Sequence, residues 1–396
     1  MQYECVEKYF FAIDFLLESE ETNMQFRDLG AQYKTLKPEI DAAIADVIAS
    51  NAFILGAPVT ELENKLATYV GRKHCVAVAN GTEALQLALM AWDIGPGDAV
   101  FTSDFTYFAS AGCASIIGAT PVLVDIDLAT FNMSPEALET EIKRVIAEGK
   151  LKPKAIIPVD LFGLPADYAR ILPIAEKYGL QVVEDAAQGF GGRIHDKVAC
   201  SFGDASATSF FPAKPLGCYG DGGAIFTDDD AIDARLRSLR AGGKSPVDKY
   251  DNREIGMNSR LDTLQAAILL PKFKAFVDYE LDAVNKAAKW YDERLQGKFV
   301  IPTIPEGFLS SWAQYTILMK DRAERDAMQK RLKEKGIPSM VYYPRGLHQQ
   351  AAYAWMGLTD EPYPNTVEAT NRVLSLPMHP YLTEEVVDGI CKEMLS

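Results

Sequence analysis

Between residues 50 and 230, short apolar runs alternate with longer segments whose apolar residues recur at helical spacing. The short runs predict β-strands, and the segments between them, such as residues 167–178, predict helices. Thr60 and Glu63 have the spacing of a capping box, which predicts that a helix begins there. This alternation predicts an α/β fold in which helices cover both faces of a mostly parallel central sheet. Its strands are expected at His74–Ala79, Ala99–Thr102, Pro121–Val124, Ala155–Val159, Gln181–Val183, Ala205–Phe211 and Gly223–Phe226.

The chain length and the later pattern predict two domains. A chain of 396 residues is too long for one compact core. A long helical pattern follows residue 261, with a kink or break expected at Pro271. We expect a large domain over residues 24–275 and a smaller α/β domain over residues 276–396. The small domain is expected to contain strands at 314–319 and 339–343 and a final helix after Thr383. Residues 1–23 are expected to form an extension outside the fold.

Composition and charge disfavour several kinds of partner. The formal net charge of −15 opposes binding to nucleic acids or anionic membranes, because their phosphates repel an acidic surface. The six cysteines and four histidines show no metal-ligand spacing, so we expect no metal site and reduced thiols in the cytoplasm. No apolar run is long enough to span a bilayer. The apolar stretch at residues 9–17 lacks a basic region and contains Asp14, which disfavours a signal peptide.

Two polar segments directly follow predicted strands, where parallel α/β sheets bind their ligands. Gly81 and Thr82, in Asn80-Gly81-Thr82, begin a helix whose free N–H groups suit a phosphate, although an ordinary helix cap has the same pattern. Asp185 follows the strand at 181–183 and is placed to hold a ring nitrogen protonated, and a helix N-cap is again the alternative.

Lys214 lies between Phe210-Phe211-Pro212 and Pro215-Leu216-Gly217. Such an apolar setting lowers the pKa of a lysine and makes the neutral, nucleophilic amine available. The alternative is a surface lysine on a loop. A phosphate-binding turn, a carboxylate and a buried amine in one α/β cleft are together what a pyridoxal cofactor requires, because the carboxylate keeps its pyridine nitrogen protonated.

The chain resembles the DegT/DnrJ/EryC1/StrS family, the sugar aminotransferase branch of the fold-type I pyridoxal-phosphate enzymes. The resemblance extends from Met24 to the C-terminus, and members of the family usually begin near Met24. It implies the aspartate aminotransferase-like fold. Apart from the three segments above, the matching segments are Phe26-Arg27-Asp28-Leu29, Phe53-Ile54-Leu55-Gly56, Gly256-Met257-Asn258-Ser259-Arg260-Leu261-Asp262 and Ser375-Leu376-Pro377-Met378-His379-Pro380.

The resemblance implies a role for each matched position around the cofactor ring. Lys214 is expected to bind pyridoxal 5′-phosphate as a Schiff base and to move the proton between carbon centres. Asp185 is expected to pair with the pyridine nitrogen, and Gln188 to contact the ring hydroxyl. Tyr107 matches an aromatic residue that stacks on the ring, with core packing as the alternative.

The phosphate end of the cofactor is expected to bind Gly81, Thr82 and Ser209. Asn258 matches a residue that similar enzymes deliver across a dimer interface to the partner's phosphate site. The resemblance therefore implies an obligate homodimer with two shared active sites.

Three further residues match positions on the substrate side. Arg260 and Tyr343 are expected to approach the nucleotide sugar, and His348 lies in a loop that resembles the substrate-side loop. The chain departs from many relatives at Asp160 and around Tyr342, where histidine is common in the family. Both departures are expected near the sugar pocket, so they bear on substrate identity and leave the cofactor chemistry unchanged.

The implied reaction is ping-pong transamination from glutamate to a nucleotide-linked keto sugar. The motif around Lys214 resembles enzymes that act on UDP- or dTDP-linked 3-keto sugars, including UDP-2-acetamido-3-keto-glucuronate, for surface polysaccharide or lipopolysaccharide synthesis. A 4-keto-6-deoxy sugar is the alternative substrate, and a non-catalytic regulator that binds the cofactor is a rival function. Lys214 argues against a dehydratase of this fold, which has histidine there, and the glycines at 220–223 lack the spacing of a nicotinamide site.

Overall fold

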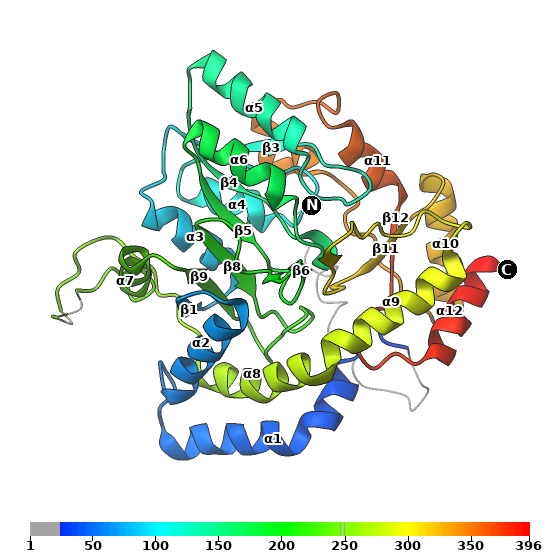
Figure 1. Ribbon diagram of the computed structural model, residues 1–396, viewed down its shortest axis with the longest axis horizontal. Helices are drawn as coiled ribbons and strands as arrows, with labels where there is room; N and C mark the ends of the chain where they lie inside the picture. The colour runs from blue at the N-terminus through cyan, green and yellow to red at the C-terminus, as the bar shows by residue number, and fades with distance from the viewer. Residues whose placement is uncertain (1–23, 246, 249) are drawn as a thin grey trace, which may run out of the picture.

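The computed structural model describes residues 24–245, 247–248 and 250–396. The predicted extension over residues 1–23 lies outside the described residues. A long helix, α1 (Leu29–Ser50), begins the described chain and packs on the later helix α8 (Thr263–Ala275) through Leu36, Ile40 and Ile268. Figure 1 shows these two helices side by side along one edge of the molecule.

The centre of the fold is a seven-stranded sheet in the order β1-β9-β8-β5-β4-β2-β3. Antiparallel pairing occurs only where β9 meets β1 and β8, and the four remaining neighbouring pairs within this sheet are parallel. Each predicted strand is present, with ends shifted by a few residues, so the predicted α/β class with a mostly parallel sheet is confirmed. The bounds are β1 (His74–Val78), β2 (Asp98–Ser103), β3 (Thr120–Val124), β4 (Lys152–Ile157), β5 (Gln181–Asp185), β8 (Ala205–Ser209) and β9 (Gly223–Thr227).

Helices cover both faces of the sheet, as predicted, because successive strand residues point to opposite sides. Val183 packs with one helical layer, whereas its neighbour Val182 packs with the other. The first layer contains α3 (Gly81–Ala91), α4 (Ala109–Ile116) and α7 (Asp230–Leu239). The second contains α5 (Pro135–Glu148) and α6 (Tyr168–Tyr178), and α2 (Ala57–Val70) and α8 pack beside it near β1 and β9.

The helix α2 corrects the capping-box prediction. It begins at Ala57 after the N-cap Gly56, with a proline in its first turn, and not at Thr60. Glu63 is buried, and its carboxylate accepts a hydrogen bond from the Ala77 N–H at 2.8 Å and pairs with Arg240 at 2.6 Å. The Glu63 carboxylate therefore stabilises contacts between distant segments, and it does not cap the helix as the sequence pattern predicted.

The C-terminal part is built from α9 (Leu281–Leu295), α10 (Arg322–Glu334), α11 (Pro364–Arg372), α12 (Glu384–Leu395) and the antiparallel pair β11 (Tyr315–Leu318) and β12 (Val373–Leu376). The predicted strand at 314–319 and the helix after Thr383 are confirmed. The predicted strand at 339–343 is wrong, because that segment makes only a single bridge, between Met340 and Ser375. Short elements complete the described chain: β6 (Arg193–Ile194), β7 (Lys197–Val198), β10 (Phe308–Leu309) and the 3-10 turns at 161–163, 347–349 and 351–356.

The predicted domain boundary at residue 275 coincides with a π-helical turn, Phe276–Glu280, that joins α8 to α9. Pro271 does not end the helix, since α8 continues four residues beyond it. One apolar cluster extends from α2 and α8 to α9 and α12. The division into two domains therefore remains a prediction.

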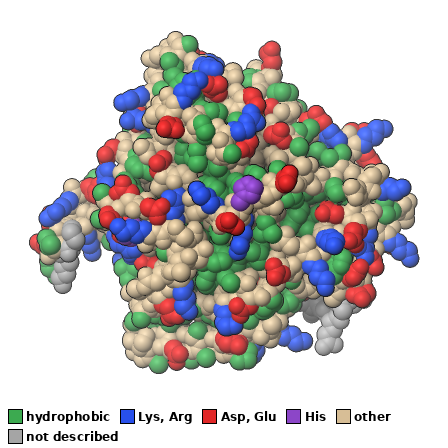
Figure 2. Space-filling model, viewed as in Figure 1, with side chains coloured by type: hydrophobic (Ala, Val, Ile, Leu, Met, Phe, Trp, Pro, Cys, Tyr) green, Lys and Arg blue, Asp and Glu red, His purple; other side chains and the backbone are tan. Residues whose placement is uncertain are grey.

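The surface and the described helices give two further findings. On the face drawn in Figure 2, acidic and basic side chains are intermingled and form no extended basic patch. Within the described ranges, no helix is long and apolar enough to cross a membrane.

Candidate active site

The carboxyl ends of the neighbouring strands β5 and β8 form the centre of the candidate site. Asp185 ends β5 and Ser209 ends β8, and the two strands pair in parallel. Gly81 begins α3 and lies against Ser209, because a Cβ built on Gly81 would be 2.7 Å from the Ser209 Cβ. The fold thus brings together three of the predicted cofactor residues, which come from separate strand ends.

Lys214 lies on the loop after β8, and its side chain is partly buried. Burial lowers the pKa of this amine to about 8, although the nearby Asp185 carboxylate opposes the shift. The Arg27 guanidinium, which donates to the Pro215 carbonyl at 3.2 Å, also lowers the Lys214 pKa. A substantial fraction of this amine is therefore neutral and nucleophilic near neutral pH.

Asp185 is a buried carboxylate with dedicated hydrogen-bond donors. Burial raises its pKa, and the donors oppose that shift. The Ser110 hydroxyl donates to Oδ2 at 2.7 Å, and the Ala187 N–H donates to Oδ1 at 3.2 Å. Sequence reasoning missed Ser110, which lies on α4, because nothing in the local sequence indicates a contact with a residue 75 positions later.

Gln188 links the end of β5 to the C-terminal part of the chain. Its side-chain oxygen accepts a hydrogen bond from the Phe162 N–H at 2.7 Å, and its Nε2 donates to the Tyr343 hydroxyl at 3.0 Å. Burial raises the pKa of Tyr343, so this hydroxyl stays protonated. The structure therefore places Tyr343, a predicted substrate residue, beside a predicted cofactor residue.

The start of α3 supplies unpaired backbone N–H groups. Asn80 caps the helix by accepting a hydrogen bond from the Glu83 N–H at 2.8 Å. The N–H groups of Gly81 and Thr82 belong to the first turn and therefore have no intrahelical partners. The backbone here is pressed against β9, because a Cβ on Gly223 would lie 2.6 Å from the Asn80 carbonyl oxygen. Gly81 and Thr82, together with Ser209, thus form a compact turn that suits a phosphate group.

Three other predicted residues lie at the surface or partly buried. The Tyr107 ring is 58% exposed, so it does not pack in the core of this chain. Asn258 is exposed and pairs with Ala241 in an isolated bridge, and Arg260 is partly buried. The intervening residue, Ser259, accepts from the Ala79 N–H at 3.2 Å, which places this segment beside the turn that begins α3.

His348 lies away from solvent, between two carboxylates. Its Nδ1 contacts Asp104 Oδ2 at 2.5 Å, and its Nε2 contacts Asp360 Oδ1 at 2.9 Å. Its ring also stacks on Tyr363, with centroids 4.6 Å apart. Both ring nitrogens are therefore engaged within the chain, and a substrate contact through His348 stays a prediction.

Asp160, one of the two departures from the family, lies beside Asp185, and its N–H donates to the Asp185 carbonyl at 3.0 Å. Its side chain is fully buried, and its Oδ1 accepts hydrogen bonds from the Tyr168 hydroxyl at 2.8 Å and the Ala166 N–H at 3.0 Å. Gly189 packs directly against it. These neighbours enclose the carboxyl group, and the expectation that this departure lies near the sugar pocket stays a prediction.

Known proteins match this chain over almost its full length. The model of the DegT/DnrJ/EryC1/StrS aminotransferase family matches residues 34–395. The chain belongs to this family. It is similar to the UDP-2-acetamido-2-deoxy-3-oxo-D-glucuronate aminotransferase of Pseudomonas aeruginosa, with 45% identity over 94% of this chain and 100% of that protein.

Solved structures of the family superpose closely on this aminotransferase. A DegT DnrJ EryC1 StrS aminotransferase from Brucella abortus is 48% identical, with a TM-score of 0.91 over 94% of this chain and 98% of that one. The NtdA protein of Bacillus subtilis with bound cofactor PMP is 28% identical, with a TM-score of 0.79 over 91% and 82% of the two chains. PMP is the aminated form of pyridoxal phosphate.

Pyridoxal phosphate is the cofactor of this family member, and the residues described above fit it. The neutral Lys214 amine suits an aldehyde, the Asp185 carboxylate suits a protonated pyridine nitrogen, and the turn at Gly81 suits a phosphate. Among the described residues, no group of three histidine, cysteine or acidic side chains could hold a metal ion.

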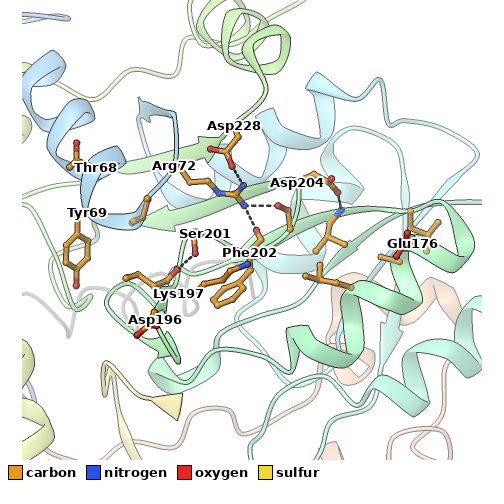
Figure 3. Close-up of a pocket in the computed structure, with 18 residues that line it drawn as sticks. Thr68, Tyr69, Arg72, Glu176, Asp196, Lys197, Ser201, Phe202, Asp204 and Asp228 are labelled. Carbon is orange, nitrogen blue, oxygen red and sulfur yellow. Dashed lines mark hydrogen bonds and ion pairs between the residues drawn. The ribbon is translucent and has the colours of Figure 1, made fainter. Parts of the chain in front are cut away.

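A cleft of about 770 Å³ opens near the amino ends of β5 and β8, whereas the candidate site lies at their carboxyl ends (Figure 3). Arg72 lies across it and bonds Asp228 at 2.6 Å and the carbonyls of Phe202 and Gly203. None of the predicted site residues lines this cleft. It is therefore separate from the aminotransferase site.

Proposed function

We propose that this aminotransferase transfers the amino group of glutamate to the keto group of a nucleotide-linked 3-keto sugar, of the UDP-2-acetamido-3-keto-glucuronate kind. The substrate class rests on the similarity to the Pseudomonas aeruginosa enzyme. The chemistry rests on one observation, the position of Lys214 on the loop after β8, near the Asp185 carboxylate that ends the neighbouring strand β5, where burial lowers the pKa of the Lys214 amine. The product would be an amino sugar for surface polysaccharide or lipopolysaccharide synthesis in the cytoplasm.

Each side chain of the site has a definite task in such a reaction. When bound, pyridoxal phosphate supplies an aldehyde and a ring that withdraws electrons from the substrate carbon. Lys214 Nζ takes a proton from the substrate carbon and returns it at a different carbon, which a neutral amine can do at physiological pH. Asp185, held by the Ser110 hydroxyl, keeps a negative charge opposite the ring nitrogen. The turn at Gly81 holds the phosphate, and this fixes the distance from Lys214 to the reacting carbon.

We further propose a homodimer with shared active sites. Asn258 is exposed in the single chain, and its segment is anchored beside the phosphate-binding turn through Ser259 and Ala79. An exposed amide next to a phosphate site fits a residue that serves a second copy of the chain.

The proposed function is tested by the colour of the purified protein. The wild type should be yellow, bleach with glutamate, and regain its colour with the correct keto sugar. A panel of UDP-3-keto, dTDP-3-keto and 4-keto-6-deoxy sugars identifies the acceptor. Recolouring by a 4-keto-6-deoxy sugar alone would assign the alternative substrate, and cofactor binding without any bleaching by glutamate would favour a non-catalytic regulator.

Lys214→Ala is the matched control. It should form no borohydride-reducible adduct with pyridoxal phosphate, because the only proposed site for the bond is the Lys214 amine. An adduct at the same site in this variant would refute the lysine assignment.

A further inference from the structure

Two fully buried carboxyl groups, those of Asp160 and Glu184, are hydrogen-bonded to each other behind the cofactor site. Glu184 precedes Asp185 on β5, so the two side chains point to opposite faces of the sheet. Asp160 lies just beyond β4, next to Val159, which forms a bridge with Asp185. The pair therefore lies directly under the strand end that carries the cofactor-binding carboxylate.

The hydrogen bond between the two carboxyl groups implies that one of them carries a proton. The Glu184 carboxylate accepts from the Cys200 N–H at 2.7 Å and the Phe202 N–H at 2.8 Å. Asp160 Oδ1 accepts from the Tyr168 hydroxyl and the Ala166 N–H, whereas its Oδ2 meets no donor among the described residues. Two carboxyl oxygens can share a hydrogen bond only if one of them carries a proton.

Asp160 is the member of the pair that carries this proton. Burial raises the pKa of both groups, and it raises that of Asp160 well above its usual range because the Glu184 charge adds to the effect. Two backbone donors favour the ionised form of Glu184. The other titratable groups that act on the pair are Tyr168 and Cys200, and burial keeps both of them protonated.

The Asp160 segment contacts both ends of the turn that carries the predicted ring contacts. The Asp160 N–H donates to the Asp185 carbonyl at 3.0 Å, and the Phe162 N–H donates to the Gln188 side chain at 2.7 Å. Directly after Gln188, a Cβ on Gly189 would lie 2.4 Å from the Asp160 Cβ, so the turn and the Asp160 side chain are in direct contact. The segment that contains Asp160 is therefore in contact with the turn at Asp185, at Gln188 and at Gly189.

We propose that Asp160, as a neutral acid hydrogen-bonded to Glu184, is a positioning residue that holds Asp185 and Gln188 in the geometry required to bind the pyridoxal ring. This inference rests on the proposed roles of Asp185 and Gln188. It assigns a function to a residue that touches neither cofactor nor substrate, and it requires a carboxamide or a carboxylic acid at position 160.

The location of the proton is tested by the pH dependence of stability in the apoprotein. The pKa of Asp160 is higher in the folded protein than its ordinary value of 3.8, which applies to the unfolded chain. The protonated group therefore stabilises the fold fully below pH 3.8, and this stabilisation is lost as the pH rises towards the pKa of the folded state. The unfolding constant of the wild type, relative to Asp160→Asn, should therefore rise about tenfold per pH unit over that range. Asp196→Asn, at an exposed aspartate, is the control and should run parallel to the wild type. A parallel profile for Asp160→Asn would overturn the assignment of the proton.

The positioning role is tested by cofactor affinity in the folded protein. Asp160→Ala should weaken pyridoxal phosphate binding at least about tenfold, because the turn loses its support, whereas Asp160→Asn should bind within about twofold of the wild type. Binding is measured by fluorescence titration well below the melting temperature of each variant. The absorbance of the bound chromophore against pH reports whether Asp185 still faces the ring nitrogen, and it should shift in Asp160→Ala alone.

Tyr168→Phe keeps the test informative if Asp160→Ala does not fold. It removes only the hydroxyl that donates to Asp160 and keeps the ring that stacks on Phe202 at 4.4 Å. It should weaken cofactor binding about threefold or more, since one hydrogen bond to the acid is lost. Unchanged affinity and chromophore in both variants would overturn the inference while the cofactor site stands. Failure of the wild type to bind the cofactor through Lys214 would instead refute the proposed function.

Discussion

The reactivity of the Lys214 amine follows quantitatively from its surroundings. Its pKa of about 8, against an ordinary 10.5, reflects burial that the Asp185 charge only partly offsets. At about pH 7.5 roughly a quarter of such amines are neutral, against roughly a thousandth of ordinary lysines, a difference of about 200-fold. Asp185→Asn removes the charge that stabilises the ammonium form, so the Lys214 pKa should fall further in that variant.

Competitive acylation of the apoprotein, read at each lysine by mass spectrometry, measures this pKa without any cofactor. Labelling of Lys214 should rise to half its maximum near pH 8 in the wild type and at a lower pH in Asp185→Asn. Lys150, which is exposed, provides the internal reference in the same digest. A midpoint near the ordinary 10.5, or an upward movement in Asp185→Asn, would refute the argument that burial beside Asp185 activates this amine.

Three further outcomes are expected. Gly81→Ala should weaken pyridoxal phosphate binding at least about tenfold, because its Cβ would lie 2.7 Å from the Cβ of the residue that ends β8; calorimetric titration checks this. Burial lowers the pKa of His348, but the Asp104 and Asp360 carboxylates outweigh this effect, so the pKa is raised overall. The ion pairs therefore stabilise the fold fully below about pH 6.5, and this stabilisation is lost as the pH rises through the raised pKa. The melting temperature of Asp104→Asn should fall less steeply with rising pH than that of the wild type. Mixing Asn258→Ala with Lys214→Ala subunits should restore one good site per dimer in a cofactor titration, and no recovery would exclude shared sites.

The sheet and the cofactor residues could be predicted because their signals are local. A strand that is buried on both faces is mostly apolar, and the apolar runs Cys75–Val78 of β1 and Ala224–Phe226 of β9 show this pattern. Residues after such strands fall at one edge of a parallel sheet, which is why Asp185 and Gly81 could be assigned to one site before their contacts were known.

The wrong predictions concern residues whose partners are distant in the sequence. Glu63 has the spacing of a capping residue, yet its carboxylate pairs with Arg240, 177 positions later. The apolar segment at 339–343 has the composition of a strand, but within it only Met340 forms a β-bridge, with Ser375. The burial of Asp160 against Tyr168 of α6 likewise has no signal in the local sequence.

The supply of hydrogen-bond donors explains why two buried aspartates so close together have different charges. Asp185 receives a donor on each oxygen, from the Ser110 hydroxyl and the Ala187 N–H, and it faces the Lys214 amine. Asp160 receives its donors on one oxygen only, and its carboxyl group is hydrogen-bonded to that of Glu184. Burial raises the pKa of both aspartates, but the donors on Asp185 oppose that rise and favour its ionised form. The negative charge therefore resides on the aspartate that faces the cofactor, and the neutral acid resides on the one that supports the turn beneath it.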